Sequence, residues 1–150
     1  MLSGDSRVGK SEYALSLVPR GQALRLNCMN VKYPPLREYD DEVHKLIVFD
    51  EASVSLVLDN RLLFQAPNDH VQVGTSPTNR DVYSVYLHYC HCVVTSNTWK
   101  RQMEILKKEN YEDWHWLNKN SVHYECEEKL YEDDEPLAAP STPTANPESP

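Results

Sequence analysis

Short apolar runs that end in polar side chains recur along this chain, a pattern typical of buried strands in a parallel sheet. The two clearest runs are residues 45–51, which end in two acids, and 92–97, which are rich in β-branched side chains. Weaker strand patterns cover residues 23–28 and 121–126. These runs predict the strands of one sheet.

Two segments have the pattern of helices. Residues 11–18 follow a glycine-containing loop, and residues 98–108 place Met103, Ile105 and Leu106 among basic side chains. Helical segments that alternate with buried strands are typical of α/β proteins. The chain is therefore predicted to fold as an α/β protein, with a five-stranded, mostly parallel sheet covered by helices.

A turn-rich segment between the two clearest strands is predicted to form a hairpin. Residues 74–81 are flanked by the strand-like stretches 71–73 and 82–86. At such a hairpin Arg80 could contact phosphate and Tyr83 or Tyr86 could stack on bases, as in proteins that bind single strands. The alternative is an ordinary exposed hairpin, because one arginine supplies little charge for this task.

The loop ahead of the first helix carries the most specific motif. Residues 4–11 match the phosphate-binding P-loop pattern G-x-x-x-x-G-K-[ST] at every fixed position, and this loop is the predicted nucleotide site. Inward-facing N–H groups and the following helix N-terminus bind phosphate, with Lys10 on the β- and γ-phosphates and Ser11 on Mg²⁺. The alternative is a glycine-rich turn before a helix. The predicted nucleotide-binding residues are Gly4, Asp5, Ser6, Arg7, Val8, Gly9, Lys10 and Ser11.

Polar residues at the ends of the two clear strands supply the other groups that hydrolysis needs. Asp50 is the candidate for holding Mg²⁺, and Glu51 is the candidate general base. Asn97 stands where an amide could contact both the γ-phosphate and the attacking water. Taken singly, the acids could instead begin a helix and the asparagine could belong to a turn.

Three motifs in this order, GDSRVGKS, LIVFDEA and VVTSN, resemble motifs A, B and C of superfamily 3 helicases. The chain is most similar to the helicase half of replication-initiator (Rep) proteins of circular single-stranded DNA viruses such as circoviruses. The resemblance extends from the P-loop to about residue 131, and includes residues 58–63 and 71–74. It implies an AAA+-like P-loop ATPase that uses ATP and Mg²⁺ to unwind nucleic acid, DNA rather than RNA, as a ring of subunits.

The chain also departs from this family. Val73 stands where the family usually has a lysine, and Asn118 and Lys119 stand where Rep proteins often have two arginines. An arginine finger contributes about 10³-fold or more to the rate, so Arg80 or Arg101 would have to replace it. The motifs of the Rep nuclease half are absent from the sequence, and strand nicking is not predicted.

The two ends of the chain differ from its middle. Only three residues precede the P-loop, fewer than a usual strand, so the first strand is expected to be incomplete. Residues 132–150, acidic and rich in proline, are predicted to be a disordered tail, which leaves residues 1–131 as the folded domain. The tail carries five of the 23 acidic residues and none of the 15 basic ones, so the total charge of −8 becomes −3 for the domain. A weakly acidic body permits a basic pore loop without favouring nucleic acid.

Four cysteines suggest free thiols in a reducing compartment, the nucleus or the cytoplasm. The sequence shows no secretory segment and no long apolar stretch, so no membrane partner is expected. The cluster from His88 to Cys92, with His123 and Cys126 downstream, raises the alternative of a zinc site. Residues two apart on one strand are poorly placed for tetrahedral ligation, which favours cysteines packed in the core.

Two functions of different class remain open from the sequence. The first is a helicase-type ATPase acting on nucleic acid in replication. The second is a non-catalytic remnant that binds nucleotide or protein partners without turnover. A small-molecule kinase is a third, weaker alternative, because the sequence lacks an arginine-rich lid.

Overall fold

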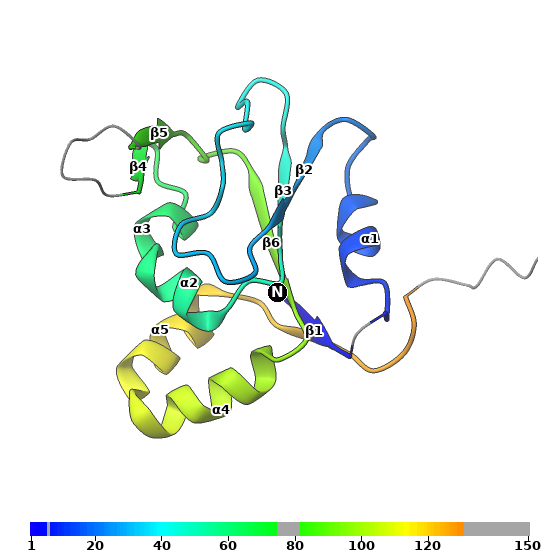
Figure 1. Ribbon diagram of the computed structural model, residues 1–150, viewed down its shortest axis with the longest axis vertical. Helices are drawn as coiled ribbons and strands as arrows, with labels where there is room; N and C mark the ends of the chain where they lie inside the picture. The colour runs from blue at the N-terminus through cyan, green and yellow to red at the C-terminus, as the bar shows by residue number, and fades with distance from the viewer. Residues whose placement is uncertain (6, 75–81, 131–150) are drawn as a thin grey trace, which may run out of the picture.

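The computed structural model describes residues 1–5, 7–74 and 82–130. They form an α/β fold around a five-stranded sheet in the order β2-β3-β6-β1-β7 (Figure 1). Every pairing in this sheet is parallel, which confirms the predicted sheet of buried parallel strands. The strands are β1 (Leu2–Gly4), β2 (Ala23–Asn27), β3 (Leu46–Asp50), β6 (His91–Ser96) and β7 (Tyr124–Cys126).

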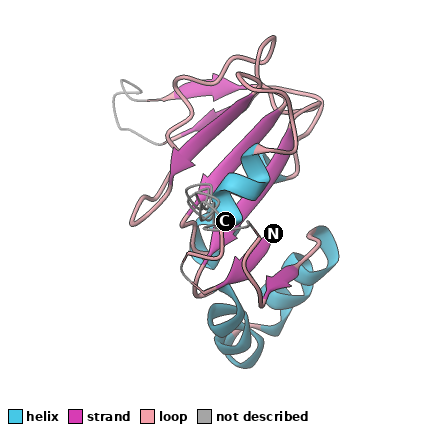
Figure 2. Cartoon of the chain, turned by 90° about the vertical axis from the view of Figure 1, so that its right-hand side faces the viewer, coloured by secondary structure: helices cyan, strands magenta, loops and turns pink. Residues whose placement is uncertain are grey.

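Helices cover both faces of the sheet (Figure 1). Helix α1 (Lys10–Leu15) lies on one face, the face turned toward the viewer in Figure 2. The helices of the other face are α2 (Val54–Asp59), α3 (Arg61–Phe64), α4 (Trp99–Glu109) and α5 (Tyr111–Asn120).

The core has two parts because side chains along a strand point alternately to the two faces. In β3, Leu46 and Val48 join the cluster beneath α1, whereas Ile47 and Phe49 join the larger cluster beneath the other helices. All four are at most 1% exposed. Strand β3 is thus buried on both faces, and its continuous apolar sequence follows from this position.

Two predicted elements are shorter than their sequence patterns. The first helix ends at Leu15, and residues 16–18 form turns, in keeping with Pro19, which disfavours helical backbone at the residue before it. The last strand begins at Tyr124, because its pairing with β1 extends over three residues only.

Strand β1 is short but lies inside the sheet, between β6 and β7. It pairs with β6 at Thr95 and Ser96, whereas the β3 side of β6 is paired from His91 to Val94. Gly4 closes this strand at φ 147°, and a Cβ at this position would collide with the carbonyl oxygen of Cys126. A glycine is therefore required where β1 passes into the loop that follows it.

The flanks of the predicted hairpin pair as expected. Strands β4 (Val71–Val73) and β5 (Tyr83–Val85) form a separate antiparallel sheet, with Val73 opposite Tyr83. Residues 75–81, including Arg80, and the tail at 132–150 lie outside the described residues. Among the described residues, no helix combines the length and the apolar character needed to cross a membrane.

Candidate functional site

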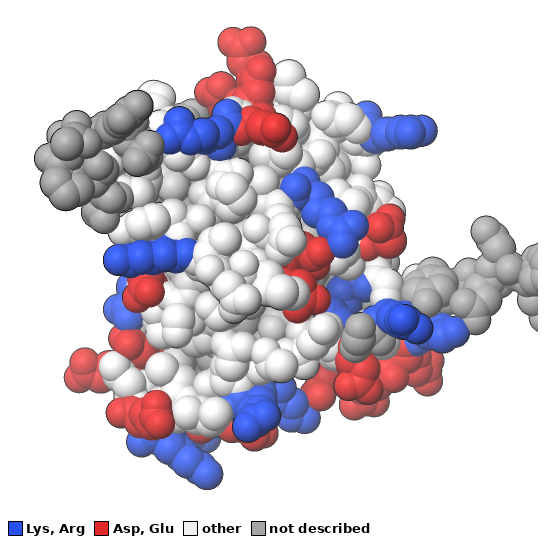
Figure 3. Space-filling view, viewed as in Figure 1, with Lys and Arg blue, Asp and Glu red and all other residues white. Residues whose placement is uncertain are grey.

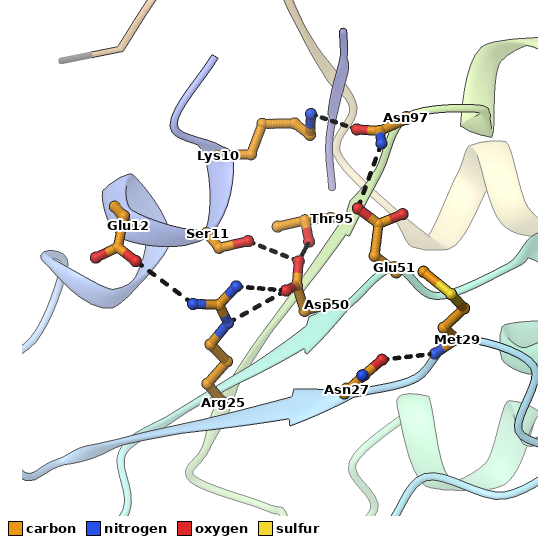
Figure 4. Close-up of polar contacts among 10 residues, drawn as sticks. All are labelled: Lys10, Ser11, Glu12, Arg25, Asn27, Met29, Asp50, Glu51, Thr95 and Asn97. Atoms are coloured by element: carbon orange, nitrogen blue, oxygen red, sulfur yellow. Dashed lines mark hydrogen bonds and ion pairs between the residues drawn. The ribbon is translucent and has the colours of Figure 1, made fainter. Parts of the chain in front are cut away.

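A cavity of about 180 Å³ lies where β3 and β6 end, against the loop formed by residues 4–11, here called the glycine loop. Parallel strands bring their carboxyl ends to one edge of the sheet, which is where ligands usually bind in open α/β folds. Residues from four separate parts of the sequence meet there (Figure 4). The cavity is lined by Arg7, Gly9, Lys10, Ser11, Glu12, Arg25, Asp50, Glu51 and Asn97.

The glycine loop turns sharply before α1. Arg7 and Gly9 have positive φ angles of 67° and 86°, a conformation that lets successive N–H groups face one side. Val8 is buried in the core beneath α1, and its carbonyl oxygen accepts a hydrogen bond from the N–H of Leu130 at 2.7 Å. The burial of Val8 and its hydrogen bond with Leu130 thus fix the loop to the rest of the fold. Ser6 lies outside the described residues.

Lys10 is buried at the centre of this edge, with 6% of its surface exposed. Its ammonium donates to the carbonyl oxygens of Gly4 at 3.0 Å and Asp5 at 2.7 Å, and to Oδ1 of Asn97 at 2.8 Å. An ammonium group has three donors, and all three are in use. In this state Lys10 joins the glycine loop to the end of β6.

The carboxylate of Asp50 is surrounded by four donors. Oδ1 accepts from the hydroxyls of Ser11 and Thr95, each at 2.6 Å. Oδ2 accepts from Nε and Nη2 of Arg25 at 3.1 and 2.7 Å. Burial by itself raises the pKa of Asp50, but the hydrogen bonds from Ser11, Thr95 and Arg25 outweigh it and hold the pKa below its usual value. Asp50 is thus an ionised group in a partly buried site.

Glu51 and Asn97 lie beside each other, because β3 and β6 are neighbouring strands of the sheet. The Nδ2 group of Asn97 lies 3.4 Å from Oε1 of Glu51, while its Oδ1 accepts from Lys10 (Figure 4). Glu51 has a φ of 56°, uncommon outside glycine, which turns the chain sharply after β3. Asn97 therefore links the lysine of the glycine loop to the candidate base.

Sequence reasoning missed three residues of this site, Glu12, Arg25 and Thr95. Thr95 is 1% exposed and lies two residues before Asn97 on β6. Arg25 lies on β2, and its hydrogen bond with Asp50 raises its own pKa. A signal for Arg25 was present in the sequence, because a charged residue alternates there with Leu24 and Leu26 and so marks a polar side of the strand.

Arg101, one candidate replacement for an arginine finger, does not line this cavity. It lies on α4 at a neighbouring hollow of about 420 Å³ that includes Asp5, Asn97, Lys100 and Glu104. The other candidate, Arg80, lies outside the described residues. Asn118 and Lys119 are exposed on α5.

The zinc alternative has no support in the part of the chain that the structure describes, where no three His, Cys, Asp or Glu side chains gather as a metal site. The prediction that residues 88–92 form one strand is wrong for His88 and Cys90, because a turn precedes β6, which begins at His91. His123 instead shares a 2.6 Å hydrogen bond with Ser3. Burial raises the pKa of the Cys92 thiol to about 12, so it is protonated at neutral pH.

The two tyrosines proposed for base stacking are engaged within the protein. The hydroxyl of Tyr83 accepts from the N–H of Leu36 at 2.7 Å, and its ring lies 4.5 Å from the guanidinium of Arg37. The hydroxyl of Tyr86 donates to Asn68 at 2.6 Å. On the face shown in Figure 3, lysine and arginine side chains are interspersed with acidic ones. The described surface of this face therefore offers no continuous basic track.

Comparison of the chain with protein-family models and with curated proteins gives no match. The chemistry of the edge is defined by its side chains: an ammonium, two guanidinium groups, a hydroxyl, three carboxylates and an amide border one cavity. Ammonium and backbone N–H groups bind phosphate, whereas carboxylate and hydroxyl oxygens suit a hard cation such as Mg²⁺. The donor set present therefore fits a metal-bound phosphate.

Proposed function

We propose that this chain binds ATP with Mg²⁺ at the glycine loop and hydrolyses it, as a P-loop ATPase of the Rep-like helicase type. The observation that carries the proposal is the meeting of Lys10, Ser11, Asp50, Glu51 and Asn97 around one cavity. These residues come from segments about 40 residues apart, in the order of the three motifs. The cavity is smaller than a whole-ligand site, so it suits the phosphates, with the nucleoside outside it.

Each side chain has a defined part in this proposal. Lys10 exchanges its present acceptors for phosphate oxygens, and Ser11 and Asp50 hold Mg²⁺. Bound Mg²⁺ would neutralise charge on the phosphates and help to orient them. Glu51 accepts the proton of the attacking water, and Asn97, already between Lys10 and Glu51, contacts the γ-phosphate.

A second candidate, nucleotide binding without turnover, is favoured by a different observation. All three donors of Lys10 and both oxygens of Asp50 are engaged by protein groups. Binding of nucleotide and Mg²⁺ must break these hydrogen bonds of Lys10 and Asp50. Of the two candidate replacements for an arginine finger, Arg101 is the one within the described residues, and it lies in a neighbouring hollow that includes Asp5 and Asn97 rather than in the cavity. If no arginine reaches the γ-phosphate, hydrolysis would lose about 10³-fold or more in rate.

The helicase part of the proposal adds single-stranded nucleic acid, DNA rather than RNA, and a ring of subunits. It is tested by adding single-stranded DNA or RNA to an ATPase assay, and by measuring molecular mass with and without ATP. Stimulation by DNA together with a nucleotide-dependent increase in mass supports this part. If a monomer hydrolyses ATP and neither DNA nor RNA stimulates it, the proposed function is restricted to ATP hydrolysis.

The decisive experiment for turnover is the substitution Glu51→Gln. We expect it to abolish ATP hydrolysis while a fluorescent ATP analogue still binds, because an amide keeps the shape of the side chain but cannot accept the proton. Glu38→Gln is the matched control, because Glu38 is exposed and does not line the cavity. Binding without hydrolysis by the unmodified chain would favour the second candidate. Equal hydrolysis by both variants would reject Glu51 as the base.

A further inference from the structure

Arg25 occupies the side of Asp50 that faces the cavity. Its guanidinium makes two hydrogen bonds to Oδ2, and Nη1 lies 3.4 Å from Oε1 of Glu12 on α1 (Figure 4). Both N–H groups converge on this one oxygen, and a hydrogen bond between two charged groups is stronger than one between neutral groups. A positive charge is thus already present at the carboxylate that the proposed function assigns to Mg²⁺.

The register of the sheet explains why Arg25 reaches Asp50. Arg25 pairs with Val48 and Asn27 with Asp50, so Arg25 and Asp50 are diagonal neighbours on adjacent strands. Diagonal positions lie about 7–8 Å apart, within reach of a long side chain that points to the same face. The Oδ1 atom of Asn27, directly opposite Asp50, instead accepts from the N–H of Met29 at 3.1 Å.

The surroundings make this contact exchangeable. The side chain of Arg25 is 47% exposed, whereas that of Asp50 is 15% exposed. Arg25 can leave into solvent without opening the core, but Asp50 is fixed by Ser11 and Thr95 on its other oxygen. A cation that approaches Asp50 from the cavity therefore meets a carboxylate whose position is fixed and a competing guanidinium that is about half exposed.

We propose that Arg25 is a resident cation of the Asp50 carboxylate that Mg²⁺ must displace, so that this arginine sets the metal concentration at which the chain takes up ATP. The inference rests on the proposed function for the nucleotide, but the competition at Asp50 itself does not require ATP. Two positive charges compete for one carboxylate, and loss of the guanidinium strengthens metal binding.

The first test measures binding of Mn²⁺, as a paramagnetic probe for Mg²⁺, to the nucleotide-free protein by electron paramagnetic resonance. Arg25→Gln is expected to bind Mn²⁺ about tenfold more tightly than the unmodified chain, because the charged competitor is gone. Arg25→Lys should lie between the two, since it keeps the charge and loses the fork. Arg20→Gln is the control, because Arg20 is an exposed arginine outside the cavity lining.

The second test titrates Mg²⁺ against binding of a fluorescent ATP analogue. Arg25→Gln should lower the half-saturating Mg²⁺ concentration by about the same tenfold factor, and Arg20→Gln should not. In an Asp50→Asn background the effect of Arg25→Gln on Mn²⁺ and Mg²⁺ should disappear, since the shared carboxylate is lost. Circular dichroism confirms that each variant is folded.

The outcomes separate the two proposals. Equal Mn²⁺ affinity in Arg25→Gln and the unmodified chain, or an equal gain in Arg20→Gln, overturns the role of Arg25. Tighter Mn²⁺ binding in Arg25→Gln with no binding of the ATP analogue by any variant supports the competition between Arg25 and the metal at Asp50, and overturns the proposed function together with the link to ATP uptake. A persistent effect in the Asp50→Asn background shows that Arg25 does not act through Asp50, and this also overturns the inference.

Discussion

The two ends of β6 differ in how their surroundings are packed. At its carboxyl end, polar side chains satisfy one another around Asp50 and Lys10. Along its first half, hollows lie on both faces of the sheet beside Met1, one of about 660 Å³ under α1 and one of about 440 Å³ on the other face. The first includes Val93 and the second includes Cys92 and Val94.

The cause of the difference is the short β1. It pairs with β6 at Thr95 and Ser96, so the residues of β6 before them have β3 as their described neighbour in the sheet. Where β1 and the glycine loop are present, Lys10, Asp50 and Asn97 have hydrogen-bond partners within the protein. Polar substitutions should therefore have large effects at the carboxyl end, and added volume should be tolerated at the other end.

The largest effect is expected from Lys10→Ala at the polar end. The change removes the charge proposed to bind phosphate, and charge-assisted hydrogen bonds to phosphate are among the strongest in proteins. We expect the affinity for a fluorescent ATP analogue to fall about 100-fold or more. Val93→Ala, at the hollow beneath α1, serves as the comparison and should leave this affinity unchanged. Similar losses in both variants would remove the functional distinction between the two ends.

A loss of stability is expected when one donor to Asp50 is deleted. Thr95→Val keeps the shape of a side chain that is 1% exposed but removes its hydroxyl. A hydrogen bond to a charged group contributes about 1.5–3 kcal/mol, so the free energy of unfolding at pH 7 should fall by this amount. Urea denaturation of Thr95→Val and Thr95→Ser, which keeps the hydroxyl, provides the measurement.

The same variants have a defined pH dependence. Because the folded-state pKa of Asp50 is lowered, its ionised form stabilises the fold above the unfolded-state pKa of about 3.9. This contribution disappears as the pH falls through the folded-state pKa. The deficit of Thr95→Val should therefore be full at pH 7 and should narrow below that pKa. A deficit that is unchanged in acid would show that Thr95 stabilises the fold by packing rather than through Asp50.

The smallest effect is expected when one methyl group is added at either of two positions beneath α1. Val93→Ile extends into the hollow and should raise the free energy of unfolding by about 0.8 kcal/mol, the value of one buried methylene. Val48→Ile adds the same group at a fully buried position and should lower it by about 1–3 kcal/mol through overpacking. Urea denaturation distinguishes the signs. Destabilisation by both would mean that the hollow cannot accept volume.

Much of the layout was predictable because it depends on local pattern. The apolar runs at 46–49 and 92–94 correctly indicated two parallel strands. The polar residues that follow them, Asp50, Glu51 and Asn97, line one cavity with Lys10. The strand order was not predictable, since parallel strands with long connections can be arranged in several ways. The length of β1 and the identity of its two neighbouring strands were not predictable from the sequence either.

The partners of Asp50 show where local reasoning ends. That Asp50 is followed by an acid and preceded by an apolar run can be read from the sequence. That Arg25 covers one oxygen while Ser11 and Thr95 hold the other follows from the pairing of β2 with β3 and of β3 with β6. Register decides which side chains become diagonal neighbours, and register is set by the packing of the whole sheet.

The sequence by itself determined the α/β class, the glycine loop and the candidate groups for phosphate and metal, because periodicity and short motifs act over neighbouring residues. The tertiary structure alone decided that the metal candidate is already paired with an arginine and that Lys10 is held by its own loop. It also decided that hollows flank the first half of β6. These features depend on contacts between residues far apart in the chain, which arise only when strands assemble in a particular order and register.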